Sequence, residues 1–147
     1  MALRYDGGLN RSVYQDSAIP VLLTVRTRFT IAQVNAGATL LALITGFKYR
    51  LVDAYAIAVG GAAAAVTTID LLATQAAASV KLVAFGQAAL TQSALVRAGS
   101  AGGVLLADGA SFVANDVSTA ITIGKTGSAV TTSTHIDIVA SFQIDEP

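Results

Sequence analysis

The feature that most constrains how this chain folds is the alternation of bulky side chains with charged or small ones, with a period of two residues. The alternation is clearest over residues 47–59, where one set of positions reads Phe47, Tyr49, Leu51, Asp53, Tyr55, Ile57 and Val59. The intervening set reads Lys48, Arg50, Val52, Ala54, Ala56 and Ala58. Successive side chains of a strand point to opposite faces. We therefore expect a sandwich strand with its bulky set in the core and its small set outside.

The same period recurs over residues 24–31 and 134–144, and turn signals rich in Gly, Asn and Asp separate these segments from shorter apolar ones. About eight strands at roughly ten-residue spacing are typical of an all-β sandwich. We expect one antiparallel β-sandwich domain over residues 19–147. Residues 1–18 are polar and show no sustained period, which predicts an extended N-terminal arm.

Charge is scarce in the middle of the chain. Between residues 54 and 107 the only charged side chains are Asp70, Lys81 and Arg97. A soluble surface normally carries more charge, and a net charge of zero favours association. These observations predict that part of the surface is buried in an assembly. The candidate subunit-interface residues are the small set of the 47–59 strand: Ala54, Ala56 and Ala58.

The charges that remain are divided unevenly. Residues 1–53 hold six basic and three acidic side chains, whereas residues 54–147 hold three basic and six acidic ones. This imbalance is too mild for nucleic-acid binding, which needs a concentrated basic patch. The longest apolar runs are too short for a membrane span. We expect neither nucleic acid nor a membrane as a partner.

Residues of the kinds used in catalysis or metal binding are few. The single histidine, His135, shares a strand face with Asp137, and the chain has no cysteine. A zinc site needs three or four ligands, and a catalytic triad needs a nucleophile beside a supported base. We interpret the two side chains as a surface polar pair. We expect no enzymatic activity, no catalytic residues, no metal site and no cofactor.

Two other features have structural interpretations. Asp53 is the one acid on the bulky set of its strand, and we expect it either to lie near the end of the sheet or to pair with an arginine such as Arg50. The segment from Gly124 to Gly127 reads Gly-Lys-Thr-Gly, but no glycine lies at the required earlier position and no helix pattern follows. We predict a hairpin turn there, and not a phosphate loop.

Three segments carry a resemblance to a known family. A glycine precedes an amphipathic strand, Gly46-Phe47-Lys48-Tyr49-Arg50-Leu51-Val52-Asp53-Ala54-Tyr55, which leads into neutral strands rich in Gly, Ala and Thr. These lead to residues 115–123, and the chain closes with Ile136-Asp137-Ile138-Val139-Ala140-Ser141-Phe142. Over residues 20–144 the chain resembles the small decoration, or cement, proteins of tailed-bacteriophage heads.

The resemblance implies a jelly-roll-like β-sandwich, commonly a homotrimer, that is made in the host cytoplasm and sits on the capsid exterior. It implies a structural role, in which the oligomer binds neighbouring major capsid protein subunits and stabilises the shell. The arm would reach the shell or an adjacent decoration subunit, and the basic first half of the chain would meet an acidic capsid surface. The candidate capsid contacts are Arg4, Tyr5, Arg11, Tyr14, Arg26 and Arg28.

An alternative function is a carbohydrate-binding β-sandwich of a phage head fibre or tail. Sugar binding uses exposed aromatic rings beside polar side chains. The chain has no tryptophan, and its phenylalanines and tyrosines fall mostly on the expected core faces. Binding to a glycan array, lost when an exposed tyrosine is replaced, would favour this alternative.

Overall fold

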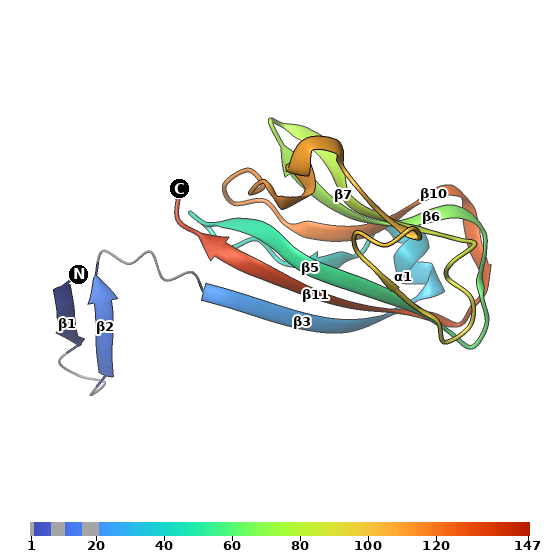
Figure 1. Ribbon diagram of the computed structural model, residues 1–147, viewed down its shortest axis with the longest axis horizontal. Coiled ribbons are helices and arrows are strands. Elements are labelled where there is room, and N and C mark those ends of the chain that lie inside the picture. The colour runs from blue at the N-terminus through green and yellow to red at the C-terminus, as the bar shows by residue number, and fades with distance from the viewer. Residues whose placement is uncertain (1, 7–10, 16–20) are drawn as a thin grey trace.

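Two antiparallel sheets packed face to face form the body of the protein (Figure 1). The computed structural model describes the backbone of residues 2–6 and 11–15 and all of residues 21–147. The four-stranded sheet has the order β3 (Val21–Thr30), β11 (His135–Asp145), β5 (Lys48–Val59), β8 (Leu95–Arg97). The five-stranded sheet has the order β4 (Thr39–Leu41), β10 (Ile121–Thr132), β6 (Ala63–Gln75), β7 (Ala78–Gly86), β9 (Gly103–Leu105).

The connections give this sandwich the topology of a jelly roll. The chain crosses between the sheets from β3 to β4, β4 to β5, β5 to β6, β7 to β8, β8 to β9 and β10 to β11, and this last strand returns beside β3. With β9 set aside, β3-β11-β5-β8 over β4-β10-β6-β7 is the strand order of an eight-stranded jelly roll. The predicted all-β, jelly-roll-like sandwich is therefore confirmed, with β9 as a ninth, three-residue strand on the β7 edge.

The core lies between the two sheets. In β11, the side chains that alternate along the sequence are the ones buried in this core. Ile136, Ile138 and Phe142 are fully buried, as their alternation predicts. Phe142 packs edge-on against Tyr49, with ring centroids 6.2 Å apart. Phe29, on the adjacent strand β3, is also buried, whereas Arg28 beside it faces outward.

The prediction for β5 is wrong beyond Leu51. In its pairing with β11, Asp53 lies opposite Ser141 and Leu51 lies opposite Phe142, so Val52 is an extra, unpaired residue. Such a β-bulge reverses the faces of the residues that follow it. Ala54, Ala56 and Ala58 consequently point into the core and are almost completely buried. They are not available to a neighbouring subunit.

Two shorter segments also differ from expectation. Residues 31–36, expected to finish a strand and enter a turn, form the helix α1 (Ile31–Ala36). Thr30 and Gln33 build a capping box at its start, and Gly37 ends it in the left-handed conformation, with φ of 74°. The segment from Gly124 to Gly127 is no hairpin turn, because it lies within β10.

Near the N-terminus, β1 (Ala2–Asp6) pairs antiparallel with β2 (Arg11–Gln15). The register runs from Ala2 opposite Gln15 to Asp6 opposite Arg11. The expected boundary between arm and domain, at residues 18 and 19, lies outside the described residues. So do the side chains of four candidate capsid contacts, Arg4, Tyr5, Arg11 and Tyr14, which stay predictions.

Candidate interaction faces

The bulge in β5 decides which side chains the four-stranded sheet shows on its outer surface. Beyond Val52, Tyr55 and Ile57 point away from the core and take places beside the outward side chains of β11, β3 and β8. The register aligns two rows across the sheet, Arg28–Asp137–Ile57–Leu95 and Arg26–Val139–Tyr55–Arg97. We call these eight residues the arginine face.

Asp137 is the acid that both arginines of β3 approach on the arginine face. It is only 6% exposed, although it lies on the outer side of the sheet. Arg28 donates to both carboxylate oxygens, from Nε at 2.7 Å and Nη2 at 2.8 Å, and Arg26 Nη2 lies 3.9 Å away. The hydrogen bonds from Arg28 hold the pKa of Asp137 below its usual value, against the opposing effect of burial. The same contact raises the pKa of Arg28.

A second bidentate pair borders the arginine face. Arg97 donates to Asp53 from Nε at 3.2 Å and from Nη2 at 2.6 Å, and these bonds raise the pKa of Arg97. Asp53 is therefore paired with an arginine as expected, but its partner is Arg97. Arg50 instead donates to Asp145 at 2.8 Å, near the end of the sheet. Both acids are thus neutralised by partners from another strand.

Four of the eight residues of the arginine face are aliphatic or aromatic. Tyr55, Ile57 and Val139 are partly exposed, and Leu95 is 56% exposed. Tyrosine and arginine around aliphatic side chains are the residue types enriched where proteins bind one another. The sequence predicts two members of this face, Arg26 and Arg28, as candidate contacts. Tyr55 and Ile57 are not among the candidates, because strict alternation along residues 47–59 places them in the core.

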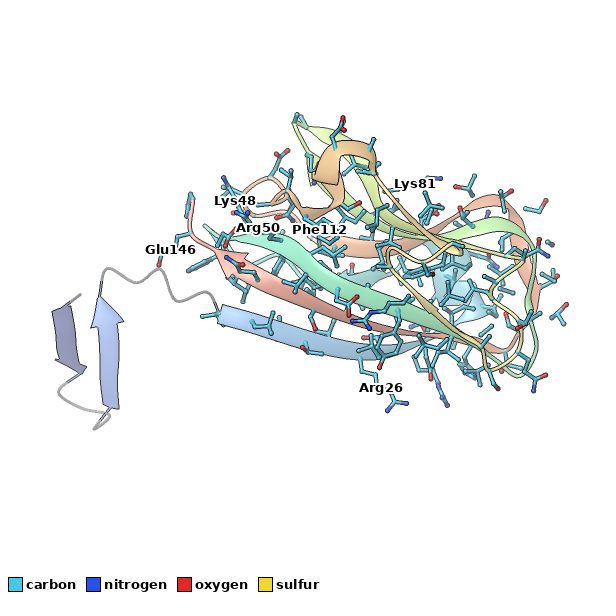
Figure 2. All side chains as sticks on the ribbon, viewed as in Figure 1. Arg26, Lys48, Arg50, Lys81, Phe112 and Glu146 are labelled. Carbon is cyan, nitrogen blue, oxygen red and sulfur yellow. The ribbon has the colours of Figure 1, made fainter. Side chains whose placement is uncertain are left out.

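The outer surface of the five-stranded sheet has a different character. Its side chains are mostly small or hydroxyl-bearing, and it carries one internal ion pair. We define the hydroxyl face by the outward residues of β6, β7, β9 and β10: Thr68, Asp70, Leu72, Lys81, Ala84, Gly86, Val104, Thr122, Gly124 and Thr126. Figure 2 shows Lys81 and Arg26 on opposite sides of the sandwich.

Asp70 is the one acid of the hydroxyl face, and it is only 1% exposed. It accepts a hydrogen bond from Thr126 Oγ1 at 2.8 Å and lies 3.3 Å from Lys81 Nζ, which also bonds to Thr126. Its Oδ1 atom has no partner among the described residues, and neither does Thr68 Oγ1. The charges of Asp70 and Lys81 compensate each other, so the face as a whole is close to neutral.

A shallow pocket of about 360 Å³ opens beside the hydroxyl face. Five hydroxyl side chains line it together with aliphatic ones: Leu43, Leu72, Ala73, Thr74, Ser79, Ser118, Thr119, Ala120 and Thr122. None of these lining residues is aromatic. The carbohydrate-binding alternative therefore gains no specific argument from this pocket.

The two side chains examined for catalysis or metal binding, His135 and Asp137, both contact neighbouring side chains. His135 lies on the same face as Asp137, as expected, but Asp137 is held by Arg28, and His135 Nδ1 lies 3.1 Å from Thr134 Oγ1. Among the residues the structure describes, no three His, Cys, Asp or Glu side chains gather where they could hold a metal ion. Within the same residues, no helix has the length and apolar character to cross a membrane.

Comparison with known proteins returned no relative. No protein-family model, no curated protein and no solved structure matches the chain. Function must therefore be argued from the two faces themselves.

Proposed function

We propose that this protein is a structural component of a tailed-phage virion, which decorates the capsid exterior and stabilises it by binding major capsid protein. The observation that carries the proposal is the arginine face. It combines aliphatic and tyrosine side chains with two arginines whose positions are fixed by bidentate pairs to Asp137 and Asp53. A preordered polar rim around aliphatic and tyrosine side chains suits a protein surface as the partner.

The same proposal includes self-association of the protein into an oligomer. The core position of Ala54, Ala56 and Ala58 removes the original candidate for subunit contact. The hydroxyl face takes its place, because it is nearly neutral and most of its side chains are small or hydroxyl-bearing. Its one ion pair is satisfied internally and needs no partner charge. A homotrimer that uses one face for its subunits and the other for the shell fits the resemblance.

The test is co-sedimentation of the full chain with purified heads of the phage whose genome encodes it, stripped of their decoration layer. We expect saturable binding that Tyr55→Ala weakens by about tenfold, since buried tyrosines often dominate interface energies. Phe112→Ala is the matched control, because Phe112 is an exposed aromatic on the 3₁₀ segment Ala107–Phe112, outside both faces. Equal loss in both variants, or no binding by the wild-type chain, would contradict the proposal.

A further inference from the structure

The four edges of the two sheets are unequal. Three edge strands, β4, β8 and β9, have only three residues each, whereas β3 has ten. An edge strand presents unpaired backbone N–H and C=O groups that can pair with another chain, and proteins commonly limit this by keeping edge strands short. The sandwich has this protection at three edges and lacks it at β3.

The β3 edge is also regular along its length. On one side β3 pairs with β11 from Val21 opposite Ile144 to Thr30 opposite His135, without a register shift. No proline or bulge interrupts it. Among residues 21–147, the one other bond to its backbone N–H groups is at its end, where Thr30 donates to the Gln33 side chain. Figure 1 shows β3 as the outermost strand of its sheet.

We propose that β3 is a pairing edge for an extended, acidic segment of a partner protein, which adds a fifth strand to this sheet. The proposal follows from the charges beside the edge. Arg26 and Arg28 both point outward from β3, at alternate positions that a neighbouring strand would match. Within the sheet, β11 places Asp137 opposite Arg28 but only Val139 opposite Arg26.

Arg26 is the selective element of this edge. Its side chain is 75% exposed, and its one polar contact among residues 21–147 is with Asp137 at 3.9 Å, whose oxygens already accept two shorter bonds from Arg28. Figure 2 shows Arg26 extending away from the sheet. A carboxylate opposite Arg26 on an added strand would repeat the arrangement that β11 provides for Arg28. Cross-strand pairs of opposite charge stabilise a sheet, and like charges directly opposite destabilise it.

The same charges disfavour a second copy of this chain at the edge. In a two-fold antiparallel pairing of β3 with itself, outward residues lie across from outward residues. The two registers that pair nine of the ten residues place Arg26 of one copy opposite or diagonal to Arg26 of the other. An incoming strand with alternating acids avoids this repulsion. The two arginines therefore favour an added strand with acidic side chains and disfavour β3 of a second copy.

The test uses the isotope-labelled full chain and two capped peptides, one with valine alternating with glutamate and one with valine alternating with lysine. Amide exchange is measured residue by residue over β3. In the free protein we expect alternate β3 amides to exchange fast, because they face the edge. Addition of the glutamate peptide should slow their exchange at least about tenfold, and the lysine peptide should leave it unchanged.

Two variants separate backbone pairing from charge attraction. Arg26→Glu should abolish protection by the glutamate peptide and allow protection by the lysine peptide, whereas Lys125→Glu, the same charge change on β10, should alter neither. Proline at the fastest-exchanging position among residues 23–27 should abolish protection by removing an edge N–H while leaving the internal ladder intact.

Three results would overturn the inference: no protection by the glutamate peptide, equal protection by both peptides, or β3 amides already protected in the free chain. The last result would mean that a second copy or residues 1–20 cover the edge, and light scattering would distinguish these two. The inference stands apart from shell binding. Loss of head binding with retained peptide binding would remove only the proposed function, and the reverse result would remove only the pairing edge.

Discussion

Two alanines in the turn between β6 and β7 adopt a backbone conformation that side chains disfavour. Ala76 and Ala77 have φ of 51° and 61°, in the left-handed region. The carboxylate of Asp116 accepts hydrogen bonds from both of their N–H groups, at 3.0 and 2.8 Å. One acid from a distant loop thus holds a turn that glycine or asparagine would form with less strain.

This turn gives a stability prediction. Ala77→Gly should raise the free energy of unfolding by about 0.5–1 kcal/mol, because the relief of left-handed strain exceeds the added chain entropy. Asp116→Ala should lower it by about 1–2 kcal/mol, because two N–H groups lose a charged acceptor. Urea denaturation measures both. Ala78→Gly, in the first residue of β7, is the control and should destabilise the protein. Stabilisation by Ala78→Gly equal to that of Ala77→Gly would contradict this account.

The paired carboxylate of Asp137 predicts acid sensitivity. Its pKa is lower in the folded protein than in the unfolded chain, so between the two values the unfolded state binds more protons. The stabilisation is therefore complete above the unfolded value of about 3.9 and is lost as pH falls through the folded value. Asp137→Asn should reduce this acid-induced loss, whereas Asp108→Asn, at an exposed site, should not. Denaturation curves between about pH 2 and 7 test this, and identical acid slopes in all three proteins would contradict it.

At the scale of elements, the strands that sequence predicts well are those with an uninterrupted period. The inward residues of β11, such as Ile136 and Phe142, could be identified from alternation alone. The helix α1 begins with a capping-box pair, Thr30 and Gln33. Ile31 also continues the strand period of β3, so the sequence alone favours a longer strand there. At such a junction, the helix-capping pattern and the strand period predict different structures for the same residues.

The bulge at Val52 explains why only part of the candidate site could be predicted. Valine is a favourable strand residue, so nothing at this position in the sequence marks an unpaired residue. The bulge is fixed by which residues of β11 lie opposite, a contact nearly ninety residues away in the chain. Arg26 and Arg28 lie on a regular strand, so alternation predicts their outward face, whereas Tyr55 and Ile57 follow the bulge, so alternation predicts the wrong face for them.

Single-residue deletions in β5 test the bulge. Removing Val52 leaves Tyr49, Leu51 and Ala54 in strict alternation with outward residues, so the variant should fold and lose no more than about 2 kcal/mol. Removing Tyr55 should prevent folding, because Ile57 would turn into core positions sized for alanine. Circular dichroism and thermal melts compare the two. Equal damage from both deletions would show that β5 tolerates no change of register.

At the scale of the whole molecule, the charges are few, and within residues 21–147 four cross-strand ion pairs bring together eight of them. Arg28–Asp137, Arg97–Asp53, Arg50–Asp145 and Lys81–Asp70 each join different strands. With a net charge of zero, little long-range repulsion opposes association. The scarcity of charge over residues 54–107 thus has two origins. One is burial in the core, which accounts for the alanines of β5, and the other is the neutral hydroxyl face.

The oligomer proposed for the hydroxyl face can be tested at its most exposed apolar residue. Val104, on β9 opposite Ala84, is 61% exposed, so a lysine there should not disturb the fold. We expect light scattering of the wild-type chain to give a multiple of 14.9 kDa and Val104→Lys to give the monomer mass, because a buried unpaired charge opposes assembly. Leu95→Lys makes a comparable change on the arginine face and should leave the oligomer intact. A wild-type monomer at about 100 μM, a concentration at which even weak oligomers assemble, would contradict self-association. Dissociation by Leu95→Lys alone would place the subunit contact on the arginine face and leave the hydroxyl face for the shell.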